Sequence, residues 1–308
     1  MNKIKIAIAG IGGVGGYFGG LLARHTAHLP DINVYFVARG EHLKKIQQKG
    51  LTVIAENETF VANPFMATDN VVEIGKVDYL IMATKSYDLD ATMKQLEPCI
   101  APHTIILPLL NGADITFRIR DLYPSNEVWY GCTYIVGRLK SPGICESTGN
   151  VHNLHFGHEK VVSEQLVFME NLMKEAGIPA TRFDKAFHAI WKKFFFISSS
   201  GTLTSYLNAD FPSLTNIPEY RELYTVLLRE LSAVAEKEGI EFEEDMVEVS
   251  LKHISRLPVG ATSSMNSDFL AKKQTELETL TGFVVRSAQK HQLDVPLYNK
   301  IYTELKNR

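Results

Sequence analysis

The sequence predicts an α/β protein in two parts, a doubly wound parallel sheet followed by an all-helical region. Short apolar runs of strand type alternate with helical patterns from the N-terminus to about residue 183, which is typical of a mostly parallel sheet. Beyond that point, apolar residues recur almost only at helical spacing. A chain of 308 residues is also long enough for about two domains. We therefore expect one domain over residues 1–183 and a second over residues 184–308.

The first part alternates strand patterns with helical ones. Helices are expected from about residue 13, from residue 41 to the natural C-terminal cap Gly50, and over residues 87–97. Pro108 indicates an edge or irregular position in its strand, because proline has no N–H to donate to a neighbour. Residues 128–158 have the pattern of further strands around a turn at residues 141–143. The other expected strands cover residues 3–9, 33–38, 51–54, 59–61, 78–83 and 104–110.

The second part is expected to begin with a helix whose N-cap is Asp184. Ala189, Ile190, Phe194 and Ile197 follow it at helical spacing and predict one buried face. Longer amphipathic patterns come after this first helix. They predict helices near residues 218–238, 243–256 and 264–291.

The apolar run at residues 3–9 leads directly into Gly10-Ile-Gly12-Gly13-Val-Gly15. This is G-x-G-x-x-G at the junction of a first strand and a first helix, the fingerprint of Rossmann-type dinucleotide-binding domains. Gly10 permits the tight turn, Gly12 lets the backbone approach a pyrophosphate, and Gly15 lets the helix pack closely on the strand. With Gly13, these residues form the expected cofactor-binding turn. The alternative is a glycine-rich turn that binds no ligand.

The residue after the second strand indicates which dinucleotide is bound. An acidic residue there usually accepts hydrogen bonds from the ribose of NAD, whereas an arginine suits the 2′-phosphate of NADP. Arg39 occupies this position, so the sequence predicts NADPH as the cofactor. The alternatives are a solvated loop arginine and a partial ribose contact from the nearby Glu41. Lys85 and Asn111 follow two later strands, and the carboxyl ends of parallel strands place them on the cofactor side.

Composition excludes several other classes of function. The net charge is −3 with no basic run, so neither nucleic acid nor an anionic membrane is an expected partner. No apolar stretch approaches the roughly 20 residues that span a bilayer. The three cysteines form no C-x-x-C pair, which favours a reducing, cytoplasmic location. His152, His155 and His158 recur every third residue, but i and i+3 face opposite sides of a strand, so no metal site is predicted.

Several short motifs together resemble the signatures of the ketopantoate reductases, the 2-dehydropantoate 2-reductases of pantothenate biosynthesis. The resemblance covers nearly the whole chain and keeps the motifs in order. It rests on Tyr17-Phe18-Gly19 after the glycine-rich turn, Asn111-Gly112, Trp191-Lys192-Lys193, Ser263-Ser264-Met265-x-x-Asp268 and Thr275-Glu276.

The resemblance implies hydride transfer from NADPH to the ketone carbon of a branched 2-oxo acid. It implies that Lys193 donates the proton to the ketone oxygen, that Glu276 orients the lysine and contacts substrate or cofactor, and that Ser264 hydrogen-bonds the substrate. Asn111 is implied to contact both cofactor and substrate, and Lys85 the cofactor. An ammonium near the ketone can both stabilise the developing charge and deliver a proton. The alternatives are solvated helix faces for Lys193 and Glu276 and an N-cap for Ser264.

The chain departs from the family pattern on the helix that carries Lys193. The family usually has asparagines four and eight residues after the lysine, where this chain has Ile197 and Gly201. The serines at 198–200 could partly substitute, and Asn208 could supply a polar group to the substrate. A site that recognises a substrate hydroxyl through polar side chains discriminates less against other substrates when those side chains are absent. A different, more apolar 2-oxo acid is therefore an alternative substrate.

Two further expectations stay open at this point. The chain could instead be an NADP-binding regulator that has kept the nucleotide site and lost turnover, although Lys193 and Glu276 speak against this. The helical part could also bury an apolar face against a second copy, which would give a homodimer.

Overall fold

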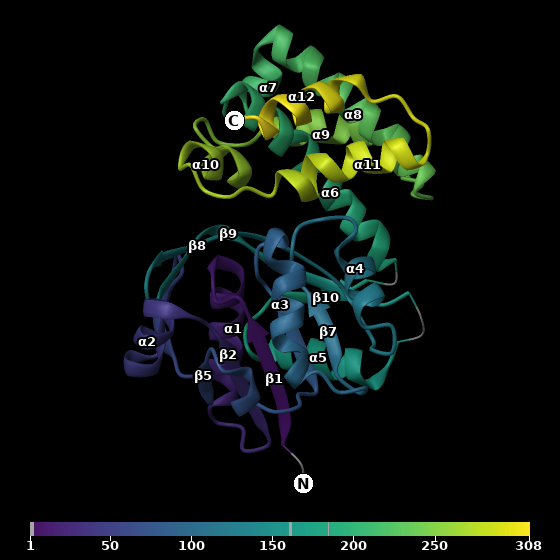
Figure 1. Ribbon diagram of the computed structural model, residues 1–308. Helices are drawn as coiled ribbons and strands as arrows, with labels where there is room; N and C mark the ends of the chain where they lie inside the picture. The colour runs from purple at the N-terminus through teal and green to yellow at the C-terminus, as the bar shows by residue number, and fades with distance from the viewer. Residues whose placement is uncertain (1–2, 160–161, 184) are drawn as a thin grey trace. The chain divides into compact units, whose positions relative to one another are not determined.

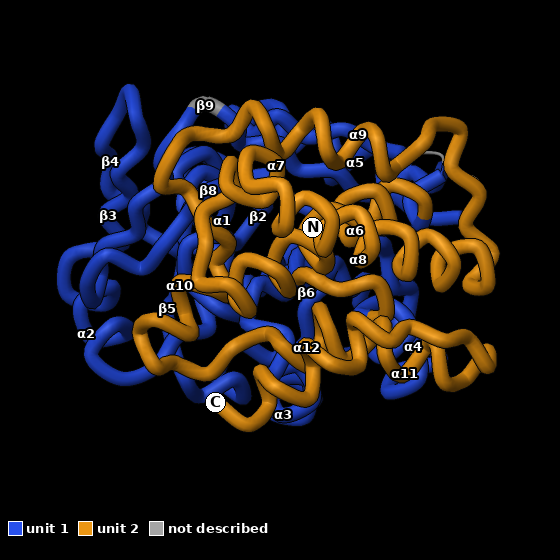
Figure 2. The backbone as a smooth tube through the Cα atoms, turned by 90° about the horizontal axis from the view of Figure 1, so that it is seen from above, with its two compact units in different colours: residues 1–110, 115–187 blue, residues 111–114, 188–308 orange. Residues whose placement is uncertain are grey.

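The computed structural model describes residues 3–159, 162–183 and 185–308. The chain divides into two compact units, residues 1–110 with 115–187 and residues 111–114 with 188–308 (Figure 2). The division falls within helix α6 (Ala186–Leu207), slightly beyond the boundary expected at residue 183. The predicted N-cap Asp184 lies outside the described residues.

The first unit contains a five-stranded sheet in the order β5-β2-β1-β6-β7, and every neighbouring pair in it is parallel. Ala9 at the end of β1 pairs with Val37 of β2 and Met82 of β6, so these carboxyl ends lie level. The strand order reverses between β1 and β6, which makes this edge the expected place for a ligand. The strands are β1 (Ile4–Ala9), β2 (Ile32–Val37), β5 (Met66–Thr68), β6 (Tyr79–Met82) and β7 (Ile105–Pro108).

The predicted doubly wound sheet is confirmed, and so is the position of Pro108, which ends the edge strand β7. Gly50 follows α2 with φ +74°, as expected of a helix-ending glycine. The short strand β5 is not among the predicted strands. The helices and helical turns of this unit are α1 (Gly13–Thr26), α2 (Gly40–Lys49), α3 (Leu89–Leu96), α4 (Ile115–Leu122), α5 (Glu164–Glu175), η1 (Val71–Glu73), η2 (Ser86–Asp88) and η3 (Glu97–Cys99).

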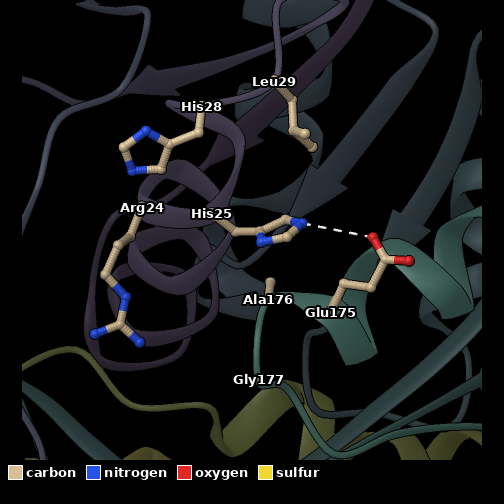
Figure 3. A pocket seen from close by; sticks show the side chains of 7 residues that line it. All are labelled: Arg24, His25, His28, Leu29, Glu175, Ala176 and Gly177. Atoms are coloured by element: carbon tan, nitrogen blue, oxygen red, sulfur yellow. Dashed lines mark ion pairs between the residues drawn. The ribbon is translucent and has the colours of Figure 1, made fainter.

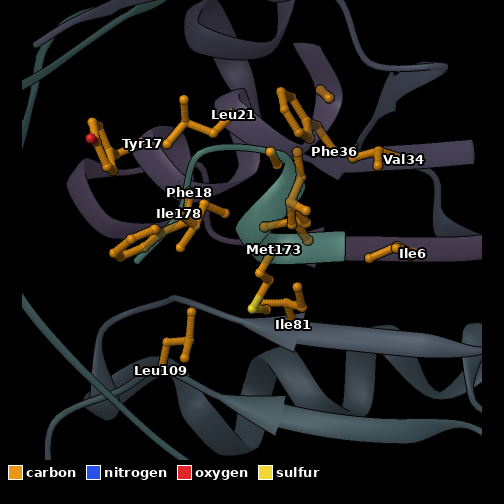
Figure 4. Packing of buried hydrophobic residues seen from close by; sticks show 14 of the residues in the cluster. Ile6, Tyr17, Phe18, Leu21, Val34, Phe36, Ile81, Leu109, Met173 and Ile178 are labelled. Atoms are coloured by element: carbon orange, nitrogen blue, oxygen red, sulfur yellow. The ribbon is translucent and has the colours of Figure 1, made fainter. Parts of the chain in front are cut away.

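Alternate residues of the central strands enter two separate cores. Ile6 and Ile8 of β1 pack with Phe36 and with Phe18 of α1 on one face (Figure 4). Their neighbour Ala7 belongs to the core of the other face, which includes the buried side chains of α3. Because side chains alternate across a strand, apolar residues at successive positions indicate a sheet covered on both faces.

A second, mixed sheet covers the side of α1 away from β1, and it is not predicted by the sequence. The hairpin of β8 (Tyr130–Ser141) and β9 (Ile144–Gly157) confirms the turn expected at residues 141–143. β9 also pairs in parallel with β3 (Leu51–Ile54) and β10 (Ala180–Arg182), and β3 pairs with β4 (Thr59–Ala62). Helix α1 contacts strands of both sheets (Figure 1). The glycine-rich turn at its start is therefore flanked by both sheets.

The described part of the second unit is helical, as predicted. One expectation is wrong: the pattern at residues 264–291 is not a single helix. α10 ends at Leu270, Lys272 adopts a left-handed φ of +52°, and the chain becomes helical again only near the π-helical turn η4. A left-handed residue ends a helix because it turns the backbone away from the axis. The elements are α6, α7 (Ser213–Asn216), α8 (Pro218–Lys237), α9 (Met246–Ile254), α10 (Ser264–Leu270), η4 (Glu278–Gly282), α11 (Phe283–Lys290) and α12 (Pro296–Lys306).

Candidate functional site

The glycine-rich turn follows β1 at the point where the strand order reverses. Gly10 has φ +90°, and a Cβ on it would lie 2.6 Å from the backbone nitrogen of Thr84. A Cβ on Gly15 would lie 2.1 Å from the carbonyl oxygen of Gly10 and 2.9 Å from the Cβ of Ala83. Both contacts are too short for any side chain. The turn and the close packing of α1 on β1 therefore require glycine, as the motif predicts.

Gly12 and Gly13 differ in what surrounds them. A Cβ on Gly13 would lie 2.1 Å from the carbonyl carbon of Gly137 in β8, so packing alone excludes a side chain there. A Cβ on Gly12 would meet no described protein atom within 4 Å. Protein packing therefore does not explain glycine at position 12, whereas close approach of a ligand to the backbone does.

The start of α1 has the electrostatics of an anion-binding site. Its N-cap residue Gly12 makes no side-chain capping bond, and the first turn contains no acidic residue. The first backbone N–H groups of a helix have no partner within the helix, and they carry a partial positive charge. A phosphate group is a suitable partner for such a helix end.

Thr84, directly after β6, supports a ligand at the same edge of the sheet. Its hydroxyl oxygen is buried and has no hydrogen-bond partner among the described residues. Buried hydroxyls are normally paired, so this orphan atom indicates a missing partner. Thr84 is not among the predicted cofactor residues, although its place directly after a strand pattern is a signal that could have identified it. Lys85 is its neighbour and is half-buried.

Arg39 follows β2 at the N-cap position of α2. Its side chain is 89% exposed, and its closest carboxylate oxygen belongs to Asp88 at 3.9 Å. A surface pair of this kind contributes little and leaves the guanidinium able to bind a phosphate. The carboxylate of Glu41 instead lies 2.6 Å from Lys44 Nζ, and this hydrogen bond lowers the pKa of Glu41. Arg39 therefore remains the better candidate for contacting the ribose 2′ position.

A cluster of three polar side chains forms within the second unit. Lys193 Nζ donates a hydrogen bond to Asn111 Oδ1 at 2.8 Å, and Asn111 Nδ2 donates one to Glu276 Oε2 at 3.4 Å. Glu276 is buried, with 4% of its surface exposed, and Lys193 is half-buried. Lys193 lies on α6, Asn111 lies in the loop after β7, and Glu276 lies just before η4. The fold therefore brings together three of the predicted site residues.

Lys192 and Lys193 have different environments, although they are adjacent. Lys192 is exposed, and its Nζ lies 3.5 Å from a carboxylate oxygen of Glu244. Lys193 instead donates to the side-chain amide of Asn111, which also contacts Glu276. The bridging amide presents its oxygen to the ammonium and its nitrogen to the carboxylate, so it holds the two charged groups in a fixed order.

Ile197 and Gly201 lie one and two turns beyond Lys193 on the same face of α6. A Cβ on Gly201 would lie 3.7 Å from Leu280 Cδ1 and 3.7 Å from Met265 Cε. The Cβ of an asparagine at this position would already be in van der Waals contact with these two apolar side chains. The space beside Gly201 is therefore apolar on the sides formed by η4 and α10.

The serines at 198–200 could partly substitute for the missing asparagines, but in the structure their hydroxyls bond elsewhere. All three are buried, and their hydroxyls donate to backbone carbonyls of Leu280, Phe195 and Phe196. Serine hydroxyls commonly satisfy themselves in this way inside helices. These side chains therefore contribute to the hydrogen bonding and packing of α6.

Asn208 and Ser264 do not join the cluster. Asn208 is exposed, has φ +51° and follows the end of α6, about 22 Å of helix away from Lys193. The N-cap of α10 is Ser263, whose hydroxyl accepts from the backbone of Asn266 at 3.0 Å, so the capping alternative for Ser264 is wrong. Ser264 is the exposed first residue of that helix. Substrate contacts by Asn208 and Ser264 stay predictions.

A cavity of about 410 Å³ lies in the first unit at the C-terminal end of α1, the opposite end from the glycine-rich turn (Figure 3). Its ion pair joins His25 Nε2 and Glu175 Oε2 at 3.6 Å. The cavity contains none of the predicted site residues. It is lined by Arg24, His25, His28, Leu29, Glu175, Ala176 and Gly177.

The histidines of β9 have separate surroundings. His152 stacks on Tyr17 with ring centroids 4.6 Å apart, whereas His155 stacks on Phe183 at the same separation. Within the described ranges, no three or more histidine, cysteine, aspartate or glutamate side chains are grouped so that they could hold a metal ion. A search of the helices in the same ranges finds none with the length and hydropathy of a membrane span.

A parallel sheet with a glycine-rich turn at its switch point, together with a lysine–amide–carboxylate cluster, defines a dinucleotide-dependent oxidoreductase of Rossmann type. Comparison with protein families gives the particular group. The model for ketopantoate reductase PanE/ApbA matches residues 6–160, and the model for its C-terminal domain matches residues 185–308. The chain belongs to the ketopantoate reductase family. Membership makes it an oxidoreductase that uses a nicotinamide dinucleotide, and the class of reaction is reduction of a 2-oxo acid.

Individual relatives align with this chain over almost its full length. An uncharacterized oxidoreductase, YkpB of Bacillus subtilis, is 25% identical over 308 residues, which cover 98% of each chain. The crystal structure of 2-dehydropantoate 2-reductase from Porphyromonas gingivalis is 34% identical, covers 99% of each chain and superposes with a TM-score of 0.87. A D-mandelate dehydrogenase with NADH and anilino(oxo)acetate shares the fold at 22% identity and a TM-score of 0.84, covering 99% of this chain and 98% of its own.

Proposed function

We propose that the protein uses NADPH to reduce a branched 2-oxo acid to the 2-hydroxy acid, with 2-dehydropantoate (ketopantoate) as the first candidate substrate and pantoate as its product in pantothenate biosynthesis. The observation that carries the proposal is the contact of Lys193 with Asn111 and of Asn111 with Glu276. This arrangement holds the Lys193 ammonium in place against the amide oxygen of Asn111. A held ammonium is the group that a developing alkoxide requires.

The proposed chemistry follows from these side chains. NADPH held at the glycine-rich turn would supply the hydride for the ketone carbon. Lys193 stabilises the negative charge that grows on the ketone oxygen and then gives that oxygen a proton from Nζ. Asn111 fixes Nζ through its amide oxygen, and Glu276 fixes the amide through its nitrogen. The hydride and the proton together convert the ketone to a secondary alcohol.

The first unit is proposed to bind the cofactor. Gly10 and Gly15 shape the turn, Gly12 admits the pyrophosphate to the backbone, and Gly13 keeps α1 against β8. The buried, unpaired hydroxyl of Thr84 and the open side of Gly12 fit a dinucleotide at this edge. The exposed guanidinium of Arg39 supports NADPH over NADH, and Lys85 is proposed as a further phosphate contact.

A second candidate substrate class is favoured by the face of α6 beyond Lys193. Ile197 provides no polar group, and the space beside Gly201 is bounded by Leu280 and Met265. A 2-oxo acid with an apolar side chain in place of the hydroxymethyl group of ketopantoate would suit this face. The third alternative, a non-catalytic NADP-binding regulator, is opposed by the intact Lys193–Asn111–Glu276 cluster.

Turnover separates these alternatives. NADPH oxidation is followed at 340 nm with ketopantoate and with a panel of branched and linear 2-oxo acids, using Lys193→Ala as the control. We expect turnover of a branched 2-oxo acid that is lost in the control. Activity with ketopantoate would show that Ile197 and Gly201 are compatible with that substrate, whereas activity only with apolar acids would assign the changed specificity to them. NADPH binding without turnover of any acid would support the regulator.

The proposal also covers location and assembly. Cys99, Cys132 and Cys145 are buried and form no disulfide with one another, which suits a reducing compartment such as the cytoplasm. A homodimer remains the proposed assembly, and sedimentation at several protein concentrations would test it.

A further inference from the structure

We propose that His42 and Cys145 are positioning residues for the cofactor pyrophosphate. They hold two successive carbonyl groups of the glycine-rich turn and so aim the N–H groups of the same peptides at the phosphates. Neither residue belongs to the glycine motif. The inference rests on the proposed binding of NADPH by the first unit.

His42 of α2 connects two backbone segments. Its Nε2 lies 2.7 Å from the carbonyl oxygen of Ile11, and its Nδ1 lies 2.8 Å from the backbone nitrogen of Gly143 in the β8–β9 turn. The Gly143 N–H can only donate, so Nδ1 accepts and the proton of a neutral ring lies on Nε2. Burial lowers the pKa of His42, which favours this neutral form. The ring therefore donates to Ile11 and is itself fixed by Gly143.

Cys145 of β9 makes a similar contact one residue further along the turn. Its Sγ lies 3.2 Å from the carbonyl oxygen of Gly12, which also accepts the first helical bond from the Gly16 N–H. Burial raises the pKa of the Cys145 thiol to about 12, so the sulfur keeps its proton and can donate it. The thiol is 1% exposed and is not accessible for chemistry of its own.

Planar peptide geometry connects these contacts to the ligand. In a trans peptide the C=O and the following N–H point in opposite directions. Holding the Ile11 carbonyl therefore fixes the direction of the Gly12 N–H, and holding the Gly12 carbonyl fixes that of the Gly13 N–H. Both carbonyls are held by groups linked to the second sheet, so both N–H groups point away from those groups. A pyrophosphate needs donors that are already oriented, because their reorientation would cost binding free energy.

The experiment compares two ligands in matched variants. NADPH contains the pyrophosphate, whereas adenosine 2′-monophosphate contains the 2′-phosphate alone. His42→Asn keeps a polar atom near Gly143 but does not reach Ile11, and His42→Gln keeps a donor near the Nε2 position. Cys145→Ala removes the donor to Gly12, and Cys145→Ser restores one. Dissociation constants come from calorimetric titration, and thermal melting identifies any variant that does not fold.

We expect His42→Asn and Cys145→Ala each to weaken NADPH binding about 3- to 10-fold, the value of one hydrogen bond, while adenosine 2′-monophosphate binds as in the wild type. His42→Gln and Cys145→Ser should recover most of the loss. In steady state, the KM for NADPH should rise in the first two variants with little change in kcat. Unchanged NADPH binding in both, or equal weakening of both ligands, would overturn the inference. If the wild type binds no NADPH, both the inference and the proposed function are wrong.

Discussion

The two candidate sites of this protein differ in whether backbone groups or side chains form them. In the first unit, the pyrophosphate site is the glycine-rich turn, where Gly12 and Gly13 contribute peptide groups and no side chain. The site in the second unit consists of three side chains, Asn111, Lys193 and Glu276, from segments 82 and 165 residues apart. A backbone site is encoded by a short local motif, whereas a side-chain cluster depends on how distant segments fold together. The two sites should therefore respond differently to substitution.

The largest expected effect is the loss of catalysis without the loss of cofactor. Lys193→Ala should lower kcat by about 10²- to 10⁴-fold, the usual contribution of a general acid, and leave the dissociation constant of NADPH unchanged. Lys192→Ala is the matched control, because the exposed neighbour pairs with Glu244 and should leave kcat within about twofold of the wild type. Equal losses of activity in both variants would contradict the role of Lys193, and weaker NADPH binding by Lys193→Ala would contradict the separation of the two sites.

The next largest effect should distinguish two adjacent glycines. In Gly13→Ala the new methyl group would lie 2.1 Å from the carbonyl carbon of Gly137, so the unfolding free energy should fall by roughly 3 kcal/mol. In Gly12→Ala the methyl group meets no described protein atom within 4 Å. Thermal melting should therefore remain near the wild-type value while NADPH binding weakens roughly 10- to 100-fold. A Gly12→Ala protein that binds NADPH normally would show that the pyrophosphate lies elsewhere.

Cofactor preference tests the Arg39 side chain, which is expected to contact the ribose 2′ position. Arg39→Ala should weaken NADPH binding about 10- to 100-fold through loss of a charge-assisted contact with the 2′-phosphate. NADH lacks that phosphate, and its affinity should not change. Fluorescence titration with both cofactors measures the ratio. Parallel losses for the two cofactors would mean that Arg39 does not read the 2′-phosphate.

The smallest expected effect concerns a partly buried carboxylate that connects the end of α8 to α11. Glu238 at the end of α8 accepts hydrogen bonds from Ser287 Oγ at 2.6 Å and from His291 Nε2 at 2.9 Å, and it lies 3.6 Å from Lys290 Nζ. Burial raises the pKa of Glu238, but these partners outweigh it and lower the pKa below its ordinary value. Because the folded pKa is lowered, the stabilisation is present above the ordinary glutamate pKa of about 4.3 and is lost as the pH falls through the folded pKa.

Glu238→Gln should accordingly lower the unfolding free energy by about 1 kcal/mol at pH 7. The difference from the wild type should shrink on acidification below about pH 4. Fluorescence of Trp191, measured during urea unfolding in a Trp129→Phe background, reports the second unit alone. A difference that stays constant with pH would show that the carboxylate charge contributes nothing.

The comparison also explains what the sequence could predict. The glycine-rich turn was predictable because its glycine spacing lies within one strand–turn–helix unit, whereas the contact of Gly13 with Gly137 of β8 was visible only in the structure. Pro108 was predictable as an edge residue because its missing N–H excludes a central position. The break at Lys272 was not predictable from apolar spacing, because a charged residue in the left-handed conformation leaves the pattern unchanged. The family resemblance indicated Asn111 and Lys193 as separate site residues, but their direct contact was not predicted, since nothing local pairs them.

Neighbouring residues of the same type were the hardest to interpret from the sequence. Ser263 and Ser264 are adjacent, and only the structure shows that the first caps α10. The serines at 198–200 have the chemistry of substrate ligands, but their hydroxyls bond to backbone carbonyls. A hydroxyl can satisfy itself on its own helix, so its presence near a site motif does not indicate a ligand.

Label transfer tests the central claim most directly. NADPH deuterated at both C4 positions is incubated with wild-type protein and a 2-oxo acid of the panel, and the product is analysed by NMR. The account predicts deuterium on C2 of the 2-hydroxy acid with the wild type and with Lys192→Ala, and almost none with Lys193→Ala. NADPH that binds to the wild type but transfers no deuterium to any 2-oxo acid would contradict the account.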